Sequence, residues 1–280
     1  MLRIAVPNKG MLSETAAAML QEAGYRGRRD NRELSVIDPH NDVEFFYLRP
    51  RDIATYVGSG VLDAGITGRD LLLDADSHAV EIRELGFGDS TFRFAALPGT
   101  FTDARDLAGK RVATSYTGLL KKWFEREGIE NVQLVHLDGA VESAIRLGVA
   151  DAIADVVSTG GTLRKAGLEI FGPVILESTA VLISTPEKEA AASRLISRLD
   201  GVLVAREYAL IDYDVRVEDL ERAVAITPGY QSPTISPMQE SDWVAVRSLI
   251  PVGKTNEIMD ELHDVGARAI LVTALQAVRM

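Results

Sequence analysis

The most informative segment for the fold class is Asp151-Ala-Ile-Ala-Asp155-Val-Val-Ser158-Thr159-Gly160-Gly161-Thr162, followed directly by Leu163 and Arg164. Ala152–Val157 is predicted to be a buried strand, because its residues are apolar except for Asp155. The turn that follows is rich in hydroxyl groups and glycine, and it opens into a predicted helix over Thr162–Ala166. A strand that passes through a short turn into a helix is the repeating unit of an α/β fold.

The turn has the composition of an anion-binding site. Its residues are Ser158, Thr159, Gly160, Gly161 and Thr162. Turn amides and a helix N-terminus form a nest for anions, the three hydroxyls add donors, and the two glycines let phosphate oxygens approach the backbone. The absence of lysine excludes a Walker-type phosphate loop. The leading Asp155 favours a ligand whose hydroxyls need an acceptor, such as a ribose phosphate. A capped turn without a ligand is the alternative.

Strands and helices alternate on both sides of this loop. The further predicted strands are Leu2–Val6, Val43–Leu48, Ala64–Gly68, the end of Asp106–Thr114, Val132–His136 and Ala180–Ile183. The predicted helices are one capped by Ser13 that ends at Gly24, Arg51–Ser59, one from Asp70, Gly118–Glu127, Ala140–Leu147 and Pro186–Leu199. This order predicts mostly parallel sheets that bind ligands at the carboxyl ends of their strands. Two crossovers between two such lobes would leave a cleft.

The last 70 residues follow a different pattern. Strands are predicted over Val202–Asp212, Ser232–Pro237, Trp243–Leu249 and Ala269–Ala277, with helices over Val217–Ala225 and Asn256–Val265. This order of elements is typical of a ferredoxin-like α+β sandwich. We therefore expect three parts: a discontinuous lobe I (1–89 and 180–211), a lobe II with the glycine-rich loop (90–179) and a C-terminal domain (212–280).

Composition narrows the function classes. The chain has 280 residues, of which 46% are hydrophobic and 25% charged, as in ordinary globular proteins. It has no cysteine, which excludes disulfides, thiolate nucleophiles and cysteine-bound zinc. The net charge of −11 argues against nucleic-acid binding. Neither a secretory signal nor an apolar run of about 20 residues is visible, so we expect a cytoplasmic protein that makes no contact with membrane.

Several motifs, in order, resemble one family along essentially the whole chain. They are AVPNKG (5–10), LRPRDIATYV (48–57), GITGRDLL (65–72), VATSY (112–116), LDGAVE (137–142), ITPGYQSPTISPM (226–238) and WVAVRSLIP (243–251). With the loop at 155–162 they resemble the long form of the ATP phosphoribosyltransferase family. The resemblance implies a two-lobed, periplasmic-binding-protein-like catalytic part and a ferredoxin-like regulatory domain.

The resemblance also implies the reaction and the partners. A 5-phosphoribosyl group passes from 5-phosphoribosyl 1-diphosphate to N1 of ATP, and pyrophosphate leaves. The acceptor nitrogen already has its lone pair at neutral pH, so positioning and stabilisation of the leaving group should supply most of the rate. Mg²⁺ would arrive on the diphosphate. Histidine would inhibit, and dimers would associate into hexamers.

Site residues follow by matching motifs. Those matched to the sugar phosphate are Asp155, Ser158, Thr159, Gly160, Gly161 and Thr162. Those matched to catalysis and the leaving group are Lys9 and Arg49. Those matched to the nucleotide are Gly10, Asp70, Thr114, Ser115, Tyr116, Asp138 and Glu142. Those matched to the histidine inhibitor are Asp214, Thr234, Leu249 and Ala269. Ordinary roles compete: Lys9 and Arg51 as surface charges, Asp70 or Asp138 as helix caps, Glu142 as a solvated side chain, and Tyr116 as a half-buried core residue.

Other classes fit less well. A solute-binding protein would normally carry a signal sequence and needs no phosphate nest. A prephenate dehydratase would leave the loop at 158–162 unexplained, and its threonine–arginine–phenylalanine signature is only faintly echoed at residues 90–94. Porphobilinogen-polymerising enzymes attach their cofactor through cysteine. A nonenzymatic effector domain would usually follow a DNA-binding helix pair, whereas this chain opens with a strand. The four histidines (40, 78, 136 and 263) lack metal-ligand spacing.

Overall fold

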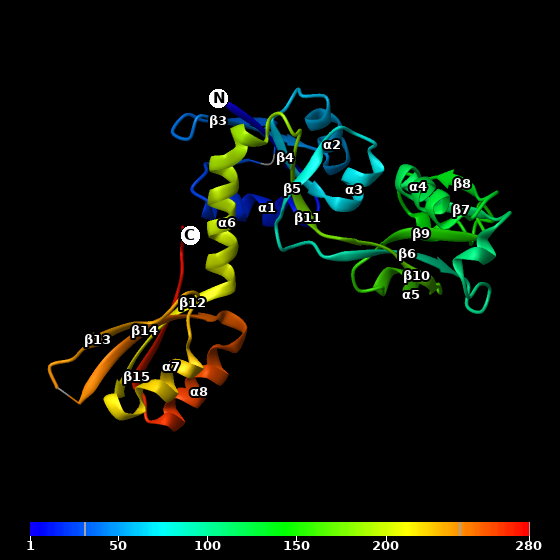
Figure 1. Ribbon diagram of the computed structural model, residues 1–280. Helices are drawn as coiled ribbons and strands as arrows, with labels where there is room; N and C mark the ends of the chain where they lie inside the picture. The colour runs from blue at the N-terminus through cyan, green and yellow to red at the C-terminus, as the bar shows by residue number, and fades with distance from the viewer. Residues whose placement is uncertain (31, 241, 280) are drawn as a thin grey trace. The chain divides into compact units, whose positions relative to one another are not determined.

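The computed structural model describes residues 1–30, 32–240 and 242–279. The chain divides into two compact units (Figure 1). The first consists of Met1–Gln21 and Tyr25–Arg194, and the second of Glu22–Gly24 and Leu195–Met280. Two sheets lie in the first unit and one in the second.

The first sheet of the larger unit has the strand order β2-β3-β1-β4-β11-β5. Its strands are β1 (Leu2–Pro7), β2 (Ser35–Asp38), β3 (Val43–Leu48), β4 (Ala64–Gly68), β5 (Val80–Glu84) and β11 (Ala180–Ser184). Its helices are α1 (Met11–Glu22), α2 (Pro50–Gly58) and α3 (Arg69–Asp74). β1 pairs in parallel with β3 and β4, and the other pairings are antiparallel.

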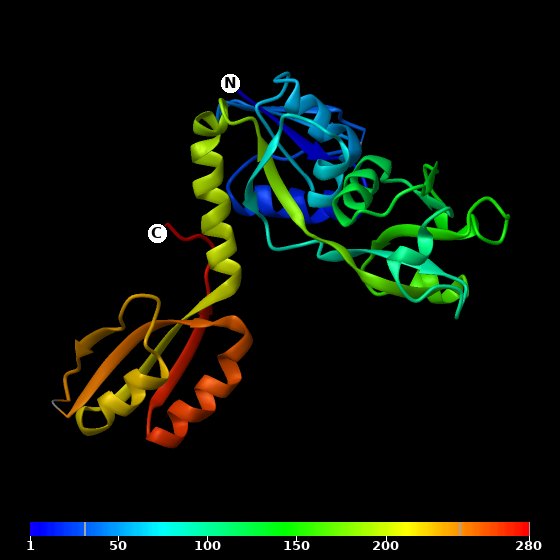
Figure 2. The same cartoon turned by 45° about the vertical axis from the view of Figure 1, so that its right-hand side comes forward.

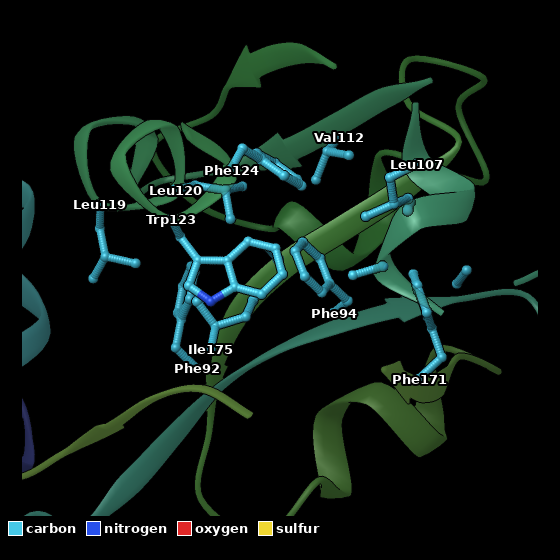
Figure 3. Close-up of a cluster of buried hydrophobic side chains, with 14 residues drawn as sticks. Phe92, Phe94, Leu107, Val112, Leu119, Leu120, Trp123, Phe124, Phe171 and Ile175 are labelled. Carbon is cyan, nitrogen blue, oxygen red and sulfur yellow. The ribbon is translucent and has the colours of Figure 1, made fainter. Parts of the chain in front are cut away.

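The second sheet has the order β10-β6-β9-β7-β8. Its strands are β6 (Ser90–Ala96), β7 (Arg111–Thr114), β8 (Gln133–His136), β9 (Ala152–Val157) and β10 (Glu169–Ser178). Its helices are η1 (Ala104–Leu107), α4 (Thr117–Glu127), η2 (Val141–Ser143) and α5 (Gly161–Lys165). An aromatic cluster fills one side of this sheet, where Phe94 packs against Trp123, Phe124 and Phe171 (Figure 3).

The chain passes twice between these sheets. Residues 85–89 lead from β5 to β6, and Thr179 alone separates β10 from β11. The two passages run side by side, since Ser178 pairs with Ser90 (Figure 1). The result is the predicted two-lobed, periplasmic-binding-protein-like architecture. The prediction of mostly parallel sheets is wrong, because among the described residues only β1 with β3 and β4, and β7 with β8 and β9, pair in parallel. Strand β11, which enters from the second lobe, runs antiparallel to β4 and β5. Strand β6, which enters from the first lobe, runs antiparallel to β9 and β10.

The smaller unit has one antiparallel sheet of order β13-β14-β12-β15. Its strands are β12 (Tyr208–Arg216), β13 (Thr234–Pro237), β14 (Trp243–Pro251) and β15 (Arg268–Ala274). Helices α7 (Leu220–Ile226) and α8 (Thr255–Val265) cover the same face of the sheet (Figure 2). The remaining helical segments are η3 (Glu189–Ala192), α6 (Ser193–Glu207), η4 (Val217–Asp219) and η5 (Val252–Lys254). This topology confirms the predicted ferredoxin-like sandwich.

Three element predictions were wrong. The strand expected from Val202 begins only at Tyr208, because the apolar stripe of α6 continues through Val202. The helix expected over Ala140–Leu147 is reduced to the short η2, since Ala140 is left-handed with φ 49°. Ser13 is buried within α1 instead of capping it. No described helix is long and apolar enough to cross a membrane.

Candidate active site

A pocket of about 370 Å³ lies where the carboxyl ends of strands from both lobes meet. Its lining residues are Lys9, Gly10, Met11, Leu12, Pro50, Gly68, Asp70, Leu71, Gly88, Ser90, Tyr116, Val156, Ser158, Ser178 and Thr179. The structure thus brings together five of the predicted site residues. This is the location expected for a ligand in an α/β fold, because side chains from several strand ends converge there.

Asp70 lies in the first turn of α3, at the floor of the pocket, and is only 7% exposed. Its Oδ1 accepts a hydrogen bond from Ser178 Oγ at 2.9 Å, and its backbone N–H donates to the same Oγ at 3.1 Å. Gly68 is necessary beside it, since a Cβ there would overlap Asp70 Oδ1. The N-cap position of α3 is occupied by Gly68, so Asp70 lies inside the first turn, and its Oδ1 is bonded to Ser178. It therefore ties the start of this helix to the strand that joins the lobes.

Tyr116 lines the same pocket, and its hydroxyl lies near the Asp70 carboxylate. Its ring meets Phe92 edge-to-face at 5.2 Å between centroids, and the Arg51 guanidinium carbon lies 4.8 Å from its centroid. Burial, followed by the negative charge of Asp70, raises the pKa of the Tyr116 hydroxyl far above its ordinary value. The phenol is therefore neutral at working pH and its ring is held in place. Such a ring suits stacking against a base.

The glycine-rich loop leaves β9 at the rim of this pocket. Ser158, Thr159 and Thr162 are exposed, and Ser158 also lines the pocket. Gly160 adopts φ 69°, a left-handed conformation that glycine reaches at little cost. Because α5 has only five residues, its dipole is small. Attraction for an anion would come mainly from loop amides and hydroxyls.

Asp155 lies near the end of β9, three residues before Ser158. Its carboxylate accepts a hydrogen bond from the N–H of Val156 at 2.8 Å. Burial raises its pKa, and the charges of Glu142 and Asp70 raise it further. The Val156 N–H and the charge of Arg51 oppose this rise. Three acidic side chains thus influence one another at this edge of the pocket, which favours a ligand that brings positive charge or hydroxyl donors.

The remaining predicted nucleotide residues are more scattered. Thr114 is fully buried, and its Oγ1 accepts from the Tyr116 N–H at 3.0 Å. Ser115 donates its hydroxyl to the carbonyl of Leu137 at 2.5 Å. Both hydroxyls shape the turn that presents Tyr116. Asp138 is 94% exposed and lies 3.1 Å from His136 Nε2, whereas Glu142 is half-buried in η2. No helix places these two acids on one face.

Arg49 and Lys9 are both exposed at strand ends, where an anionic ligand can reach their charged groups. Lys9 follows β1 and lines the pocket. Arg49 follows β3 in extended conformation and precedes Pro50, the first residue of α2. Arg51 has a more definite place than a surface charge, since its Nη1 lies 2.6 Å from Asp74 Oδ2.

Sequence reasoning missed the pocket residues on the connecting strands. Ser90, Ser178 and Thr179 line it together with Gly88. Nothing in their residue types marks them, because serine and threonine are common in any exposed segment. Only the two crossovers, which lie 90 residues apart in the chain, place them at the site.

A second candidate site lies in the smaller unit. Asp214, Leu249 and Thr234 share the face of the sheet that α7 and α8 leave uncovered, as their strand pairings require. A cavity of about 380 Å³ there is lined by Asp214, Met238, Gln239, Glu240, Trp243 and Arg268. Of the four predicted inhibitor residues, only Asp214 lines this cavity.

Ala269 sits in a bulge of β15 beside this cavity. Its φ is 49°, a left-handed conformation that costs energy for a residue with a side chain. The register between β12 and β15 shifts at this bulge, between Asp212 and Asp214. Strain of this kind is typical of ligand sites, so it supports a binding role for this end of the sheet.

No group of three or more possible metal ligands occurs among the residues that the structure describes. Asp155 precedes the glycine-rich loop by three residues, and the Glu142 carboxylate is near enough to raise its pKa. Carboxylate oxygen is the ligand that Mg²⁺ prefers, and Mg²⁺ commonly takes only one or two from the protein when phosphates supply others. The site therefore fits a magnesium ion that a diphosphate carries.

Comparisons with known proteins identify the family of the chain. The family model described as ATP phosphoribosyltransferase matches residues 49–201, and the model of its C-terminal domain matches residues 205–277. The chain is 63% identical to an ATP phosphoribosyltransferase of Arthrobacter sp. (strain FB24) and 57% identical to one of Streptomyces coelicolor, with both partners fully covered each time.

A solved structure extends the likeness to three dimensions. An ATP phosphoribosyl transferase (HisG:HisZ) complex from Thermotoga maritima superposes with a TM-score of 0.63 at 27% identity. The match covers 72% of this chain and 98% of that chain. The chain therefore belongs to the ATP phosphoribosyltransferase family, the transferases of the first step of histidine biosynthesis, in the long form that carries a C-terminal domain.

Proposed function

We propose that this chain transfers the 5-phosphoribosyl group of 5-phosphoribosyl 1-diphosphate to N1 of ATP and releases pyrophosphate. The observation that carries the proposal is the pocket in which Lys9, Tyr116 and Ser158 converge from three strand ends of the two lobes. It offers a cation, an aromatic wall and the edge of an anion cradle. These are the groups that a sugar diphosphate and an adenine base require.

The sugar phosphate would bind on the second lobe. The amides and hydroxyls of residues 158–162 would hold the 5′-phosphate, and the Asp155 carboxylate would accept from the ribose hydroxyls. Lys9 and Arg49 would approach from the first lobe and stabilise the diphosphate. Bound Mg²⁺ would supply charge neutralisation to that diphosphate, with Asp155 or Glu142 as its protein contact.

The nucleotide would lie against Tyr116, near Asp70 and Gly10. Its N1 lone pair attacks the anomeric carbon, the new C–N bond forms, and the C–O bond to pyrophosphate breaks with its electron pair on the leaving group. No group has to remove a proton from N1 before the attack. The protein's contribution is then to align the two substrates and to stabilise departing charge.

We further propose that the C-terminal domain (212–280) binds histidine and that the catalytic lobes are 1–89 with 180–211, and 90–179. Asp214, Thr234, Leu249 and Ala269 are the proposed inhibitor residues. The open sheet face shared by the first three and the strained Ala269 support this role. Association into dimers and hexamers belongs to the same proposal.

One assay tests the reaction and its regulation. Pyrophosphate release from 5-phosphoribosyl 1-diphosphate should require both ATP and Mg²⁺, and histidine should suppress it. Asp214→Ala should keep the release and lose the suppression. Release that is absent, or that proceeds equally without ATP, would contradict the transferase. If histidine still suppresses pyrophosphate release by the Asp214 variant, the histidine site does not include Asp214.

The pH dependence of this assay should reveal Asp155. Its raised pKa means that the carboxylate becomes protonated at a higher pH than an ordinary aspartate, and only the carboxylate accepts from two ribose hydroxyls. The kcat/KM for the sugar diphosphate should therefore fall on the acid side. Glu142→Gln removes a like charge, lowers the pKa of Asp155 and should move this fall to lower pH. Glu130→Gln, at an exposed position, is the control. An unmoved acid limb in the Glu142 variant would refute the coupling.

A further inference from the structure

Helix α4 of the second lobe begins without a cap from its own chain segment. Its N-cap residue is Tyr116, which makes no side-chain cap hydrogen bond. The first N–H groups of a helix have no partner inside the helix and need one from elsewhere. Asp74, the last residue of α3 in the first lobe, supplies it. Its Oδ1 accepts from the N–H of Gly118 at 2.9 Å and from that of Leu119 at 3.1 Å.

Asp74 is itself held by a cation. Arg51 Nη1 lies 2.6 Å from Asp74 Oδ2, and the Asp74 side chain is only 10% exposed. The same guanidinium lies over the Tyr116 ring at 4.8 Å. One carboxylate therefore joins α2, α3 and α4, and its cationic partner touches the aromatic wall of the pocket. A charge-assisted bond of this kind is stronger than a neutral one, and it is shielded from water here.

Gly118 allows α4 to approach this closely. A Cβ at position 118 would overlap the backbone carbonyl oxygen of Asp74, which cannot swing away as a side chain could. A second contact of α4, with the segment just after α3, lies at the surface. Lys122 Nζ pairs with Asp76 Oδ1 at 2.7 Å, where the Asp76 side chain is 83% exposed. Exposed pairs of this type contribute little to stability.

We propose that Asp74 is a positioning residue: it docks α4 of the second lobe on α3 of the first and, through Arg51, holds the Tyr116 ring at the nucleotide side of the pocket. Tyr116 directly precedes α4, so a shift of the first turn of that helix moves the ring with it. The effect on nucleotide binding rests on the proposed transfer to ATP. The docking of the lobes does not.

Kinetics test the positioning role. Asp74→Ala should raise the KM for ATP about tenfold, comparable to the loss of a helix cap, and the KM for the sugar diphosphate by less, because its 5′-phosphate would be held within the second lobe. Asp74→Asn keeps an oxygen for both amides but loses the ion pair with Arg51, so its KM for ATP should lie between those of the wild type and Asp74→Ala. Gly118→Ala should resemble Asp74→Ala. Lys122→Met, which breaks the exposed pair between α4 and Asp76, should change neither constant by more than about twofold.

A second measurement, the distance between spin labels on the two lobes, does not depend on activity. The chain has no cysteine, so His40→Cys in the first lobe and Glu130→Cys in the second can carry a unique pair of spin labels. The distance between the labels should be narrowly distributed with the wild-type Asp74 and with Lys122→Met, and broadened by Asp74→Ala or Gly118→Ala.

The outcomes separate the two proposals. A folded Asp74→Ala protein with an unchanged label distribution, or with an unchanged KM for ATP, overturns the positioning role. If that variant does not fold, Gly118→Ala decides by the same two measurements. If the parent protein releases no pyrophosphate, the proposed reaction fails, and the label distances still decide whether Asp74 docks the lobes.

Discussion

Phe94→Ala is expected to lower the free energy of unfolding of the larger unit by about 3–5 kcal/mol. Phe94 is 0% exposed in the centre of β6, and its ring lies 5.3 Å from that of Trp123 and 5.8 Å from that of Phe171 (Figure 3). Truncation removes the buried ring and leaves a cavity that three other aromatic residues border. Because β6 is also one of the two passages between the lobes, we expect the site to lose its geometry along with the stability.

Urea unfolding followed by tryptophan fluorescence measures this loss. The chain has two tryptophans, and a Trp243→Phe background leaves Trp123, in the same cluster as Phe94, as the reporter. Leu97→Ala is the control, because Leu97 follows the same strand but is 51% exposed. Its effect should stay within about 0.5 kcal/mol. A Phe94 variant as stable as this control would show that the aromatic cluster does not hold the lobe together.

Thr162→Glu is expected to raise the KM for 5-phosphoribosyl 1-diphosphate on the order of 100-fold, equivalent to roughly 2.7 kcal/mol. Thr162 is exposed in the first turn of α5, beside Gly160 and Gly161. A carboxylate there would face the dianionic 5′-phosphate across the proposed cradle. Two unit charges about 4 Å apart repel by roughly 1–4 kcal/mol near a protein surface.

The matched control for this variant is Thr162→Gln. It has nearly the same size and shape as glutamate but no charge, so it should lose about tenfold through the missing hydroxyl and added bulk. The KM for ATP should stay within about threefold in both variants. Steady-state kinetics at fixed ionic strength make the comparison. An equal rise in KM for the two variants, or an equal rise in the KM for ATP, would show that this loop does not bind the 5′-phosphate.

Local signals predicted the elements that carry the site. The apolar run of β9 and the glycine turn after it lie where the sequence pattern places them, and the strand Val43–Leu48 matches to the residue. The hydrophobic pattern and the turn residues that define such a segment lie within the segment itself, so it can be found from sequence. The helix predicted over Pro186–Leu199 was too short. The structure continues it to Glu207, because the apolar stripe of α6 extends through Val202.

The sequence predicted only some of the residues that form the site. Residue type and motif order identified Lys9, Asp70, Tyr116 and Ser158, all of which line the pocket. They did not identify Ser178, which fixes Asp70, or Asp74, which caps a helix more than 40 residues away. Their chemistry is ordinary for loop and helix residues, and it becomes specific only through the partner that the fold brings to them.

Local patterns therefore suffice to predict the α/β class, the order of elements at the ferredoxin-like end and the loop at 158–162. Each of these depends on interactions between neighbours in the chain, and hydrophobic period and turn chemistry record such interactions directly. The fold alone shows how the acids of the pocket influence one another and how Asp74, Arg51 and Tyr116 are joined across the lobes. Those properties depend on burial and on distances between segments far apart in sequence, which no local pattern encodes.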